Sequence, residues 1–394
     1  MPKNLMQTGM YWRLSGFYFT YFVVLGIMVP YFPLYLKSLG MDAWHIGLLT
    51  SVLIGTKIVA PNLWGWLADH SQQRMLIIRL GCLLAPLCFM LIFWRRDFPF
   101  LVLIIFAYSF FWNAVLAQFE AVTLFYLAKQ PEQYSRVRLW GSVGFIVSVT
   151  GLGWYFDRAT LEAFPILILL GSFAIFASSW LVPDPDPALA FARKNNDQSF
   201  FTRLRQPHIV VFFSVCFLMV LSHGPYYTFF SVLMEQNAYS HTTIGLLWSL
   251  GVLAEVVMFW FMHRLLPRFG LRSLLLVSLL LTAMRWLLLA LFPQQFGLML
   301  FGQCLHAFSF GAFHSSAIEI VRRWFSLQQS GKAQAFYSAV SFGAGNALGA
   351  LMSGALWELN STLPFLFSSI VCLFGACLVW RYLHESCFIR LENP

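Results

Sequence analysis

Four residues that can carry a charge interrupt long apolar runs of this sequence. They are Lys57, Glu255, Arg285 and His306. A carboxylate among apolar side chains can take up a proton near neutral pH because burial disfavours its charged form, and a neighbouring cation competes with that proton. Glu255, with Arg285 and His306, therefore has the residue types for reversible proton binding. Lys57 supplies a positive charge with which an anionic carboxylate can pair.

The composition indicates what surrounds these charges. Hydrophobic residues make up 59% of the 394 residues, whereas Asp, Glu, Lys and Arg together make up 10%. A water-soluble globular protein carries roughly 25% charged residues because its surface must face water. So small a charged share predicts that most of the outer surface faces a lipid bilayer.

The apolar runs have the length of membrane-spanning helices. About 20 apolar residues in helical form cross a ~30 Å hydrocarbon core. We predict an all-α membrane protein with twelve such helices, at roughly 14–36, 43–66, 75–94, 98–122, 138–156, 163–182, 208–233, 243–265, 273–292, 296–320, 333–357 and 363–383.

The net charge of +9 is better explained by membrane topology than by a nucleic-acid partner. Most of the 25 Lys and Arg residues fall on one side of the predicted membrane. The loops of the opposite side carry Lys37, Arg95, Arg96 and Arg158. Because positively charged loops stay in the cytoplasm, both termini are predicted to be cytoplasmic. The first apolar run has full length and no small-residue cleavage site, so it is expected to be a helix of the mature protein.

A charge in mid-membrane costs on the order of 3 kcal/mol, so such residues usually pair, face a cavity or carry function. Each has a structural alternative. Glu255 and Arg285 are alternatively a buried ion pair without a role in transport. His306 is alternatively an interhelical hydrogen-bond donor, and His223 and His314 are interpreted as packing or hydrogen-bonding residues.

No pattern of catalytic chemistry accompanies these charges. The seven cysteines lie mostly in or beside apolar runs without metal-ligand spacing, so neither a disulfide framework nor a metal site is expected. A nucleophile triad and a phosphate-binding loop are also absent from the sequence. An enzyme or a receptor, the rival class, is therefore not favoured, and no cofactor is expected.

A polar stretch divides the chain into two halves. Residues 183–206 contain Pro-Asp-Pro-Asp-Pro followed by a basic run and predict a cytoplasmic linker. It separates a six-helix bundle at 1–182 from a second at 207–394.

The two halves share a pattern. The segment at 46–51 reads IGLLTS, and half a chain later the segment at 244–249 reads IGLLWS. At the same spacing Lys57 falls on Glu255, Gly26 on Gly224 and Arg74 on Arg272. Parallel repeats of this kind are the plan of one large class of transporters, with a binding site between the halves near mid-membrane.

The segment GWLADHSQQR at 65–74 supplies an independent motif. It resembles the loop between helices 2 and 3 of the major facilitator superfamily, G-x-L-x-D-[RK]-x-G-[RK]-[RK]. The matching residues are Gly65, Leu67, Asp69 and Arg74, and Gln72 and Gln73 depart from the motif. Gly65 permits close helix approach, and Asp69 can cap a helix or pair with cations at the cytoplasmic helix ends. An ordinary basic turn is the alternative.

Other segments resemble the lactose permease-like proton symporters of this superfamily. RVRLWGSVG at 136–144 is similar to the start of their helix 5, which places Arg138 on a sugar-binding arginine and Glu120 on a sugar-binding glutamate. The resemblance also places Arg285 and His306 in a proton-coupling group, with Glu255 displaced by about one turn from a further glutamate. Ser309 stands where those permeases have their proton-carrying glutamate, so the expected proton site shifts to Glu255.

The closer resemblance is to the phenylpropionate permease group. It rests on PYY at 225–227, GLLWSLGVLAE at 245–255, MRW at 284–286 and a basic residue at Lys57. The substrate-site candidates are accordingly Lys57, Glu120, Arg138, Asn113 and Tyr227.

Together these features predict a monomeric, proton-coupled symporter of a bacterial inner membrane. It is expected to import a small organic solute by rocking two halves around a central site. An aromatic carboxylate such as 3-phenylpropionate is the leading substrate, with an oligosaccharide or nucleoside as the alternative. A multidrug efflux antiporter is a third reading, although the helix at 138–156 lacks the Gly-Pro pair typical of that group.

Overall fold

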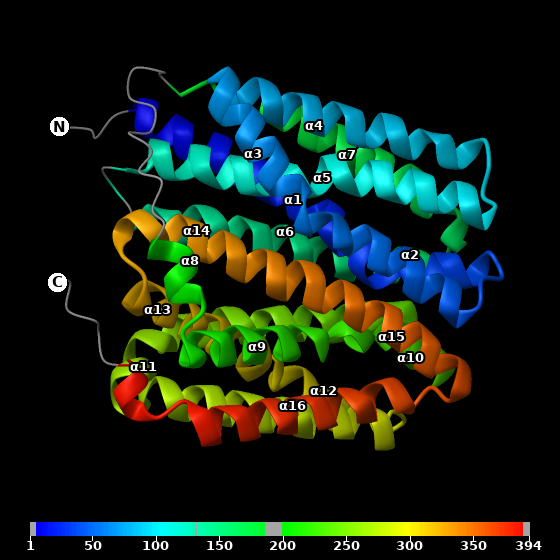
Figure 1. Cartoon of the computed structure of the whole chain (residues 1–394). Helices are drawn as coiled ribbons and strands as arrows, with labels where there is room; N and C mark the ends of the chain where they lie inside the picture. Colours follow the sequence, from blue (N-terminus) through cyan, green and yellow to red (C-terminus); the bar gives the residue numbers. More distant parts are fainter. Residues whose placement is uncertain (1–4, 129, 131, 186–198, 389–394) are drawn as a thin grey trace. The chain divides into compact units, whose positions relative to one another are not determined.

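The computed structural model describes residues 5–128, 130, 132–185 and 199–388 (Figure 1). Within these ranges every regular element is a helix. The described residues form eleven helical segments that are long and apolar enough to cross a membrane, and some of these segments consist of two or three consecutive elements. The prediction of an all-α, multi-pass membrane protein is therefore confirmed.

The longest helix, α11 (His241–Leu291), contains two of the predicted spans. A straight helix of its 51 residues would be roughly 75 Å long, more than twice the ~30 Å hydrocarbon core. Gly270 has φ 73° and ψ 164°, which is not helical, and Pro267 lies just before it. Because residues other than glycine rarely adopt such a φ, Gly270 allows the chain to turn between the two predicted spans.

The chain forms two compact units. Unit 1 comprises Met1–Met41, Val52–Ala192 and Tyr239–Ser249, and unit 2 comprises Asp42–Ser51, Arg193–Ala238 and Leu250–Pro394. Each unit therefore takes one short segment from the other half of the sequence. Within the predicted linker at 183–206, residues 186–198 lie outside the described residues.

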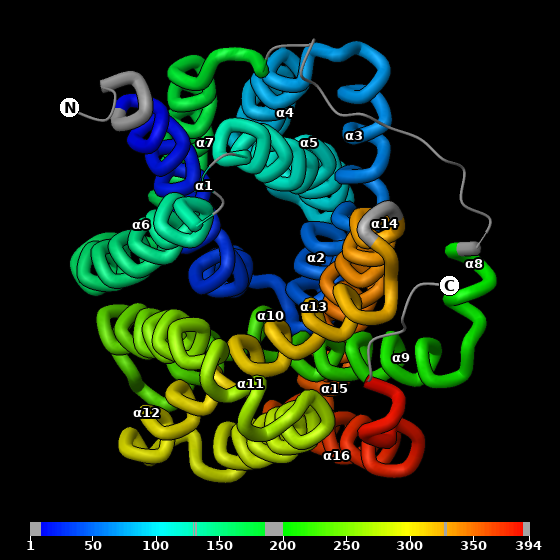
Figure 2. Tube along the Cα trace, turned by 90° about the vertical axis from the view of Figure 1, so that its left-hand side faces the viewer, coloured from blue at the N-terminus to red at the C-terminus, as the bar shows by residue number. Residues whose placement is uncertain are grey.

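Unit 1 is a bundle of long helices. Its elements are α1 (Leu5–Ser38), the end of α2 (Ala43–Gly55), η1 (Thr56–Ile58), α3 (Ala60–Ser71), α4 (Arg74–Phe89), η2 (Met90–Phe93), α5 (Phe98–Tyr126), α6 (Gln133–Phe156), η3 (Leu161–Ala163), α7 (Phe164–Ser179) and the start of α11. Figure 2 shows α1 beside α6 and α7, and α4 beside α5. A Cβ on Gly26 of α1 would lie 2.1 Å from Ser148 Oγ of α6, so this glycine permits the close approach.

Unit 2 is also a bundle of helices, and its helices are more often interrupted. Its elements are the first part of α2, α8 (Ser199–Leu204), α9 (Pro207–Leu221), α10 (Gly224–Gln236), most of α11, α12 (Phe296–Cys304), η5 (Ala307–Ala312), α13 (Phe313–Trp324), α14 (Leu327–Tyr337), η6 (Ser338–Gly345), α15 (Asn346–Leu359), α16 (Leu363–Tyr382) and η7 (Glu385–Phe388). A Cβ on Gly224 would lie 2.2 Å from the backbone of Gly349 in α15. Gly224 is the residue that the repeat aligns with Gly26, so the two positions serve the same kind of helix contact.

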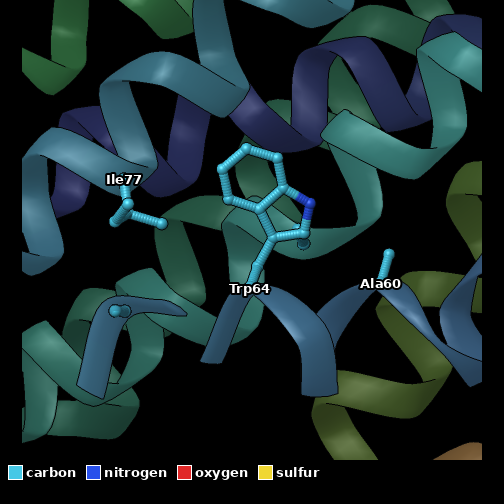
Figure 3. Close-up of a cluster of buried hydrophobic side chains, with 5 residues drawn as sticks. Ala60, Trp64 and Ile77 are labelled. Atoms are coloured by element: carbon cyan, nitrogen blue, oxygen red, sulfur yellow. The ribbon is translucent and has the colours of Figure 1, made fainter. Parts of the chain in front are cut away.

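The short helix α3 is held by apolar packing on its neighbours. Trp64 of α3 packs with Ala60 and with Ile77 of α4 (Figure 3). Ala114 of α5 belongs to the same cluster. This cluster fixes the segment that follows Lys57. The outer surfaces carry many large exposed apolar side chains, among them Trp260 at 74%, as expected for surfaces that face lipid.

Candidate functional site

The main cluster of polar side chains lies inside unit 2, where α11 meets α12 and η5. Glu255 and Arg285 both come from α11, on opposite sides of the turn at Gly270. His306 separates α12 from η5, a π-helix at Ala307–Ala312. Single π-helical turns occur frequently at functional sites because they alter the register of side chains along a helix.

Two glycines let these helices approach closely. A Cβ on Gly251, one turn before Glu255, would lie 3.2 Å from Gln303 Oε1. A Cβ on Gly311 of η5 would lie 3.0 Å from Met258 Cβ on α11. The helix that carries Glu255 therefore lies close to the helix that carries His306.

Arg285 is the centre of the cluster. It is 0% exposed, yet it has several hydrogen-bond partners. Its Nη1 donates to His306 Nδ1 at 2.9 Å and to Ser309 Oγ at 3.0 Å, and its Nη2 donates to Gln303 Oε1 at 3.1 Å. The guanidinium carbon lies 4.2 Å from the ring centroid of Tyr226 and 4.7 Å from that of Trp286, which adds cation–π attraction.

These bonds determine which nitrogen of neutral His306 carries the proton. An arginine can only donate, so His306 Nδ1 must accept from Arg285. The proton of the neutral ring then resides on Nε2. Nε2 lies 3.6 Å from Glu255 Oε2, so the imidazole directs its proton towards that carboxylate.

Glu255 is more accessible than its partners. Its side chain is 19% exposed, whereas that of His306 is 6% exposed. The cluster thus has a buried cation at one end, a histidine of fixed tautomer in the middle and a partly exposed carboxylate at the other. This order of groups can bind and release a proton at its accessible end.

Further aromatic and polar side chains enclose the cluster. His223 Nδ1 donates to the carbonyl oxygen of Met219 at 2.8 Å, which leaves Nε2 as the unprotonated nitrogen of the neutral ring. The ring centroids of His223 and His306 are 6.3 Å apart, and that of Tyr227 lies 6.0 Å from His223. Tyr227 therefore borders the same cluster.

Unit 1 contains a second charged pair. Arg138 Nε lies 3.5 Å from Glu120 Oε1. The guanidinium carbon lies 4.3 Å from the ring centroid of Phe22 and 5.4 Å from that of Tyr18. A Cβ on Gly141 would lie 3.0 Å from Arg138 Nη1, so the glycine makes room for this arrangement. A charged pair beside aromatic rings can bind hydroxyl groups and ring faces.

Lys57 lies where the helix after α2 is interrupted. It belongs to the 3₁₀ turn η1, and Pro61 follows in α3 without a backbone N–H to donate. Asn113 Nδ2 donates to Leu53 O at 2.9 Å and to Thr56 Oγ1 at 2.8 Å, which stabilises the interruption. Lys57 is partly exposed and forms no ion pair with any residue that the structure describes. Asn113 thus positions the segment that carries the lysine.

The motif residues at 65–74 form a third group. Arg74 pairs with Asp69 and also donates to Gln118 Oε1 of α5. Gln118 Nε2 in turn donates to Pro61 O at 3.3 Å. A Cβ on Gly65 would lie 3.1 Å from Gln118 Nε2, so the glycine permits this contact. The motif therefore ties α3 and α4 to α5.

Sequence reasoning missed three polar residues of these groups. Gln303 accepts from both Arg285 and Tyr226, and Gln118 accepts from Arg74. Helical spacing offered a signal, because Gln303 lies three residues before His306 and therefore on the same helix face. Tyr226 lies in the PYY segment at 225–227, but the sequence predicts no role for its hydroxyl group.

No group of metal-ligating side chains occurs among the described residues, and the cysteines are free within those ranges. The buried charges, the apolar spans and the interrupted helices together define a membrane transporter rather than an enzyme. The chain belongs to the MFS_1 like family of the major facilitator superfamily, whose model matches residues 11–368.

Curated relatives and solved structures are similar over most of the chain. The chain is 29% identical over 361 residues to the probable 3-phenylpropionic acid transporter of Escherichia coli (strain K12). The alignment covers 88% of this chain and 91% of that protein. It is 26% identical over 373 residues to the maltose permease of Geobacillus stearothermophilus, with 92% of each chain covered.

The crystal structure of nucleoside transporter NupG matches with a TM-score of 0.80 at 17% identity, covering 96% of this chain and 99% of that one. A bacterial homolog of the human lysosomal transporter Spinster, inward-facing and unoccupied, matches with a TM-score of 0.76 at 12% identity and full coverage of both chains. These likenesses establish the fold.

Proposed function

We propose that this transporter is a proton-coupled symporter that imports a small organic acid by alternating access, with an aromatic carboxylate such as 3-phenylpropionate as substrate. The observation that carries the proposal is the chain from buried Arg285 through His306 to partly exposed Glu255. The substrate is supported by the unpaired cation at Lys57 and by the similarity to the probable 3-phenylpropionic acid transporter.

The proton site and the anion are coupled through charge. Ionised Glu255 compensates the charge of Arg285, and a proton on Glu255 removes that compensation. An anionic carboxylate within reach of the cluster then binds more strongly than before. By linkage the bound anion raises the affinity for the proton by the same factor, so both are carried together.

The test is uptake by proteoliposomes that contain the purified chain, with and without an inward proton gradient. Phenylpropionate, maltose and a nucleoside serve as the three substrates. We expect gradient-driven accumulation of phenylpropionate and alkalinisation of the outer medium during uptake. Equal uptake without a gradient, or no alkalinisation, contradicts the coupling. Accumulation of only a neutral substrate contradicts the assignment of an organic acid.

Glu255→Gln separates proton movement from solute movement. This variant retains the shape of the side chain but cannot exchange a proton, so gradient-driven accumulation should fall at least about tenfold, a 1.4 kcal/mol effect or more. Exchange of labelled for unlabelled phenylpropionate without a gradient should persist. Glu162→Gln, an exposed carboxylate of η3, is the matched control and should leave both activities unchanged.

A sugar or nucleoside substrate is favoured by one observation, the Glu120–Arg138 pair beside Phe22 and Tyr18. Such a pair can hydrogen-bond hydroxyl groups while a ring stacks on the apolar face of the solute. If this pair binds the substrate, Arg138→Gln abolishes maltose or nucleoside uptake and Lys57→Ala leaves it intact. The reverse pattern supports the carboxylate.

A further inference from the structure

Unit 2 contains an apolar groove that is separate from the polar cluster. It has a volume of about 560 Å³ and lies between α9, α14 with η6, and α16, with Leu204 of α8 at one end. Its walls include Phe213, Phe217, Phe336 and Phe374. Figure 2 shows α9 alongside α16. The lining is apolar except for Ser214, a small residue of α9.

Three cations lie within four residues of the groove lining in the sequence. On α16, Arg381 follows Phe374 and Leu378 at the spacing of one helix face, and on α14, Lys332 precedes Phe336 by four residues. Arg205 directly follows Leu204. Arg205 lies in the turn between α8 and α9, Lys332 near the start of α14 and Arg381 near the end of α16. These helix ends lie at the same end of unit 2 (Figure 1). Lys332 and Arg381 therefore each lie about one helical turn beyond the apolar lining, and Arg205 is adjacent to it in the sequence.

The cations are available to a ligand. Arg205, Lys332 and Arg381 are exposed, and none forms an ion pair with a carboxylate of the described chain. Each lies within about one helical turn of the end of a candidate membrane span, the depth at which lipid headgroups occur. Two residues before Arg205, Arg203 donates to Trp324 O at 2.9 Å and ties α8 to α13.

We propose that this groove is a binding site for an anionic phospholipid. One acyl chain lies along the aromatic wall, and the phosphate lies between Arg205, Lys332 and Arg381. A neutral lipid would fill the apolar part equally well but would leave the three positive charges uncompensated. Basic pockets beside transmembrane helices select anionic headgroups for this reason. The site is independent of the proton and substrate assignments.

The experiment uses the purified full chain in phosphatidylcholine nanodiscs with a phosphatidylglycerol probe that carries a photoreactive group on its acyl chain. Cross-linked peptides are identified by mass spectrometry. We expect labelling on α9, α14 and α16, and competition by unlabelled phosphatidylglycerol but not by phosphatidylcholine. Ser214→Phe should exclude the acyl chain and abolish the labelling.

Charge-neutralising variants test the headgroup contact. Each removed cation should weaken binding about fivefold, so Arg205→Gln with Lys332→Gln should weaken it about 25-fold. Arg264→Gln with Arg268→Gln removes the same charge from exposed positions of α11 and should change nothing. Thermal unfolding and gel filtration of each variant establish that it is folded.

Four results of the labelling and competition experiments would overturn the proposal, and a fifth would reassign the groove. They are equal competition by phosphatidylcholine, labelling spread evenly over the apolar surface, no effect of the Arg205 and Lys332 substitutions, and cross-links to a second copy of the chain at the groove. Displacement of the probe by phenylpropionate would instead assign the groove to the substrate and would also contradict a lipid site.

Discussion

Arg285 Nη1 lies 2.9 Å from His306 Nδ1 in the interior of unit 2. This contact keeps the proton of neutral His306 on Nε2, on the side of Glu255. The orientation of the imidazole therefore depends on a residue that is itself fully buried. Loss of the hydrogen bond from Arg285 to His306 should therefore impair proton exchange at Glu255, even though Glu255 itself is unchanged.

Arg285→Lys tests this dependence. A lysine retains the charge but cannot donate in a fixed fork to His306, Ser309 and Gln303 at once. We expect a loss of about 1–3 kcal/mol in stability from the buried groups left without partners, and at least tenfold slower gradient-driven uptake. Thermal unfolding in detergent and uptake by proteoliposomes measure the two effects. Arg158→Lys, at an exposed position, is the control. Normal uptake by Arg285→Lys would show that the tautomer is not controlled in this way.

Gln303 should be energetically coupled to Tyr226. Gln303 Oε1 accepts from Tyr226 Oη at 3.0 Å as well as from Arg285. Gln303→Leu and Tyr226→Phe each remove one partner of this bond, so their effects on unfolding should not add. A double-mutant cycle should give a coupling of about 0.5–3 kcal/mol. Additive effects would mean that the bond contributes nothing to the stability of the cluster.

Lys57 should determine uptake of the carboxylate. Lys57→Ala is expected to abolish uptake of phenylpropionate, because the anion loses its positive partner, while the amount of protein in the membrane stays the same. Lys57→Arg retains the charge and should keep part of the activity. Uptake in cells, normalised to protein abundance by immunoblot, measures both. Full transport by Lys57→Ala would refute the role of this lysine.

The sequence was sufficient to predict the membrane fold because its signals are local. Apolar runs of span length, the charge bias of the loops and the motif at 65–74 each depend on neighbouring residues. The same locality explains why Arg285 and His306 were identified as candidates, since a charge in an apolar run is visible without a structure. Their mutual contact followed only from the resemblance to known symporters.

The missed residues are uncharged or depend on irregular backbone. Gln303 and Gln118 are common polar residues whose roles arise from partners far away in the chain. The π-helices η5 and η6 and the 3₁₀ turn at Lys57 shift side chains off the regular helical period. Helical spacing alone therefore could not give the position of Ser309 relative to Arg285.

Gly224 should be one of the least tolerant glycines of unit 2. A Cβ there would lie 2.2 Å from Gly349 C and 2.4 Å from Gly349 O, and neither backbone atom can move freely. Gly224→Ala should therefore cost about 1–3 kcal/mol by overpacking. Gly297→Ala is the control, because nothing lies within 4 Å of its added Cβ. The measurement is the melting temperature in detergent, and equal values for the two variants would contradict the close contact.

Asp157 should stabilise the start of α11 in a pH-dependent way. Its Oδ1 accepts from the backbone N of His241 at 2.7 Å, and its Oδ2 accepts from the backbone N of Thr242 at 3.0 Å. A carboxylate in this position satisfies the free amides at the start of the helix and interacts favourably with its dipole. Asp157→Ala should cost about 1 kcal/mol at pH 7.

The pH dependence follows from the pKa of Asp157. Burial raises this pKa, but the hydrogen bonds from Thr242 and His241 outweigh burial and hold it below its ordinary value of 3.8. Stability from a carboxylate whose pKa is lowered in the folded state is complete above the unfolded value and is lost as the pH falls through the folded value. The melting temperatures of the two proteins should therefore differ by a constant amount above about pH 5 and converge below about pH 4. His241 Nδ1 lies 3.3 Å from Asp157 Oδ1, so both proteins are compared in a His241→Gln background that removes titration of the imidazole. A difference that persists unchanged at pH 3 would show that the ionised carboxylate is not what stabilises the helix.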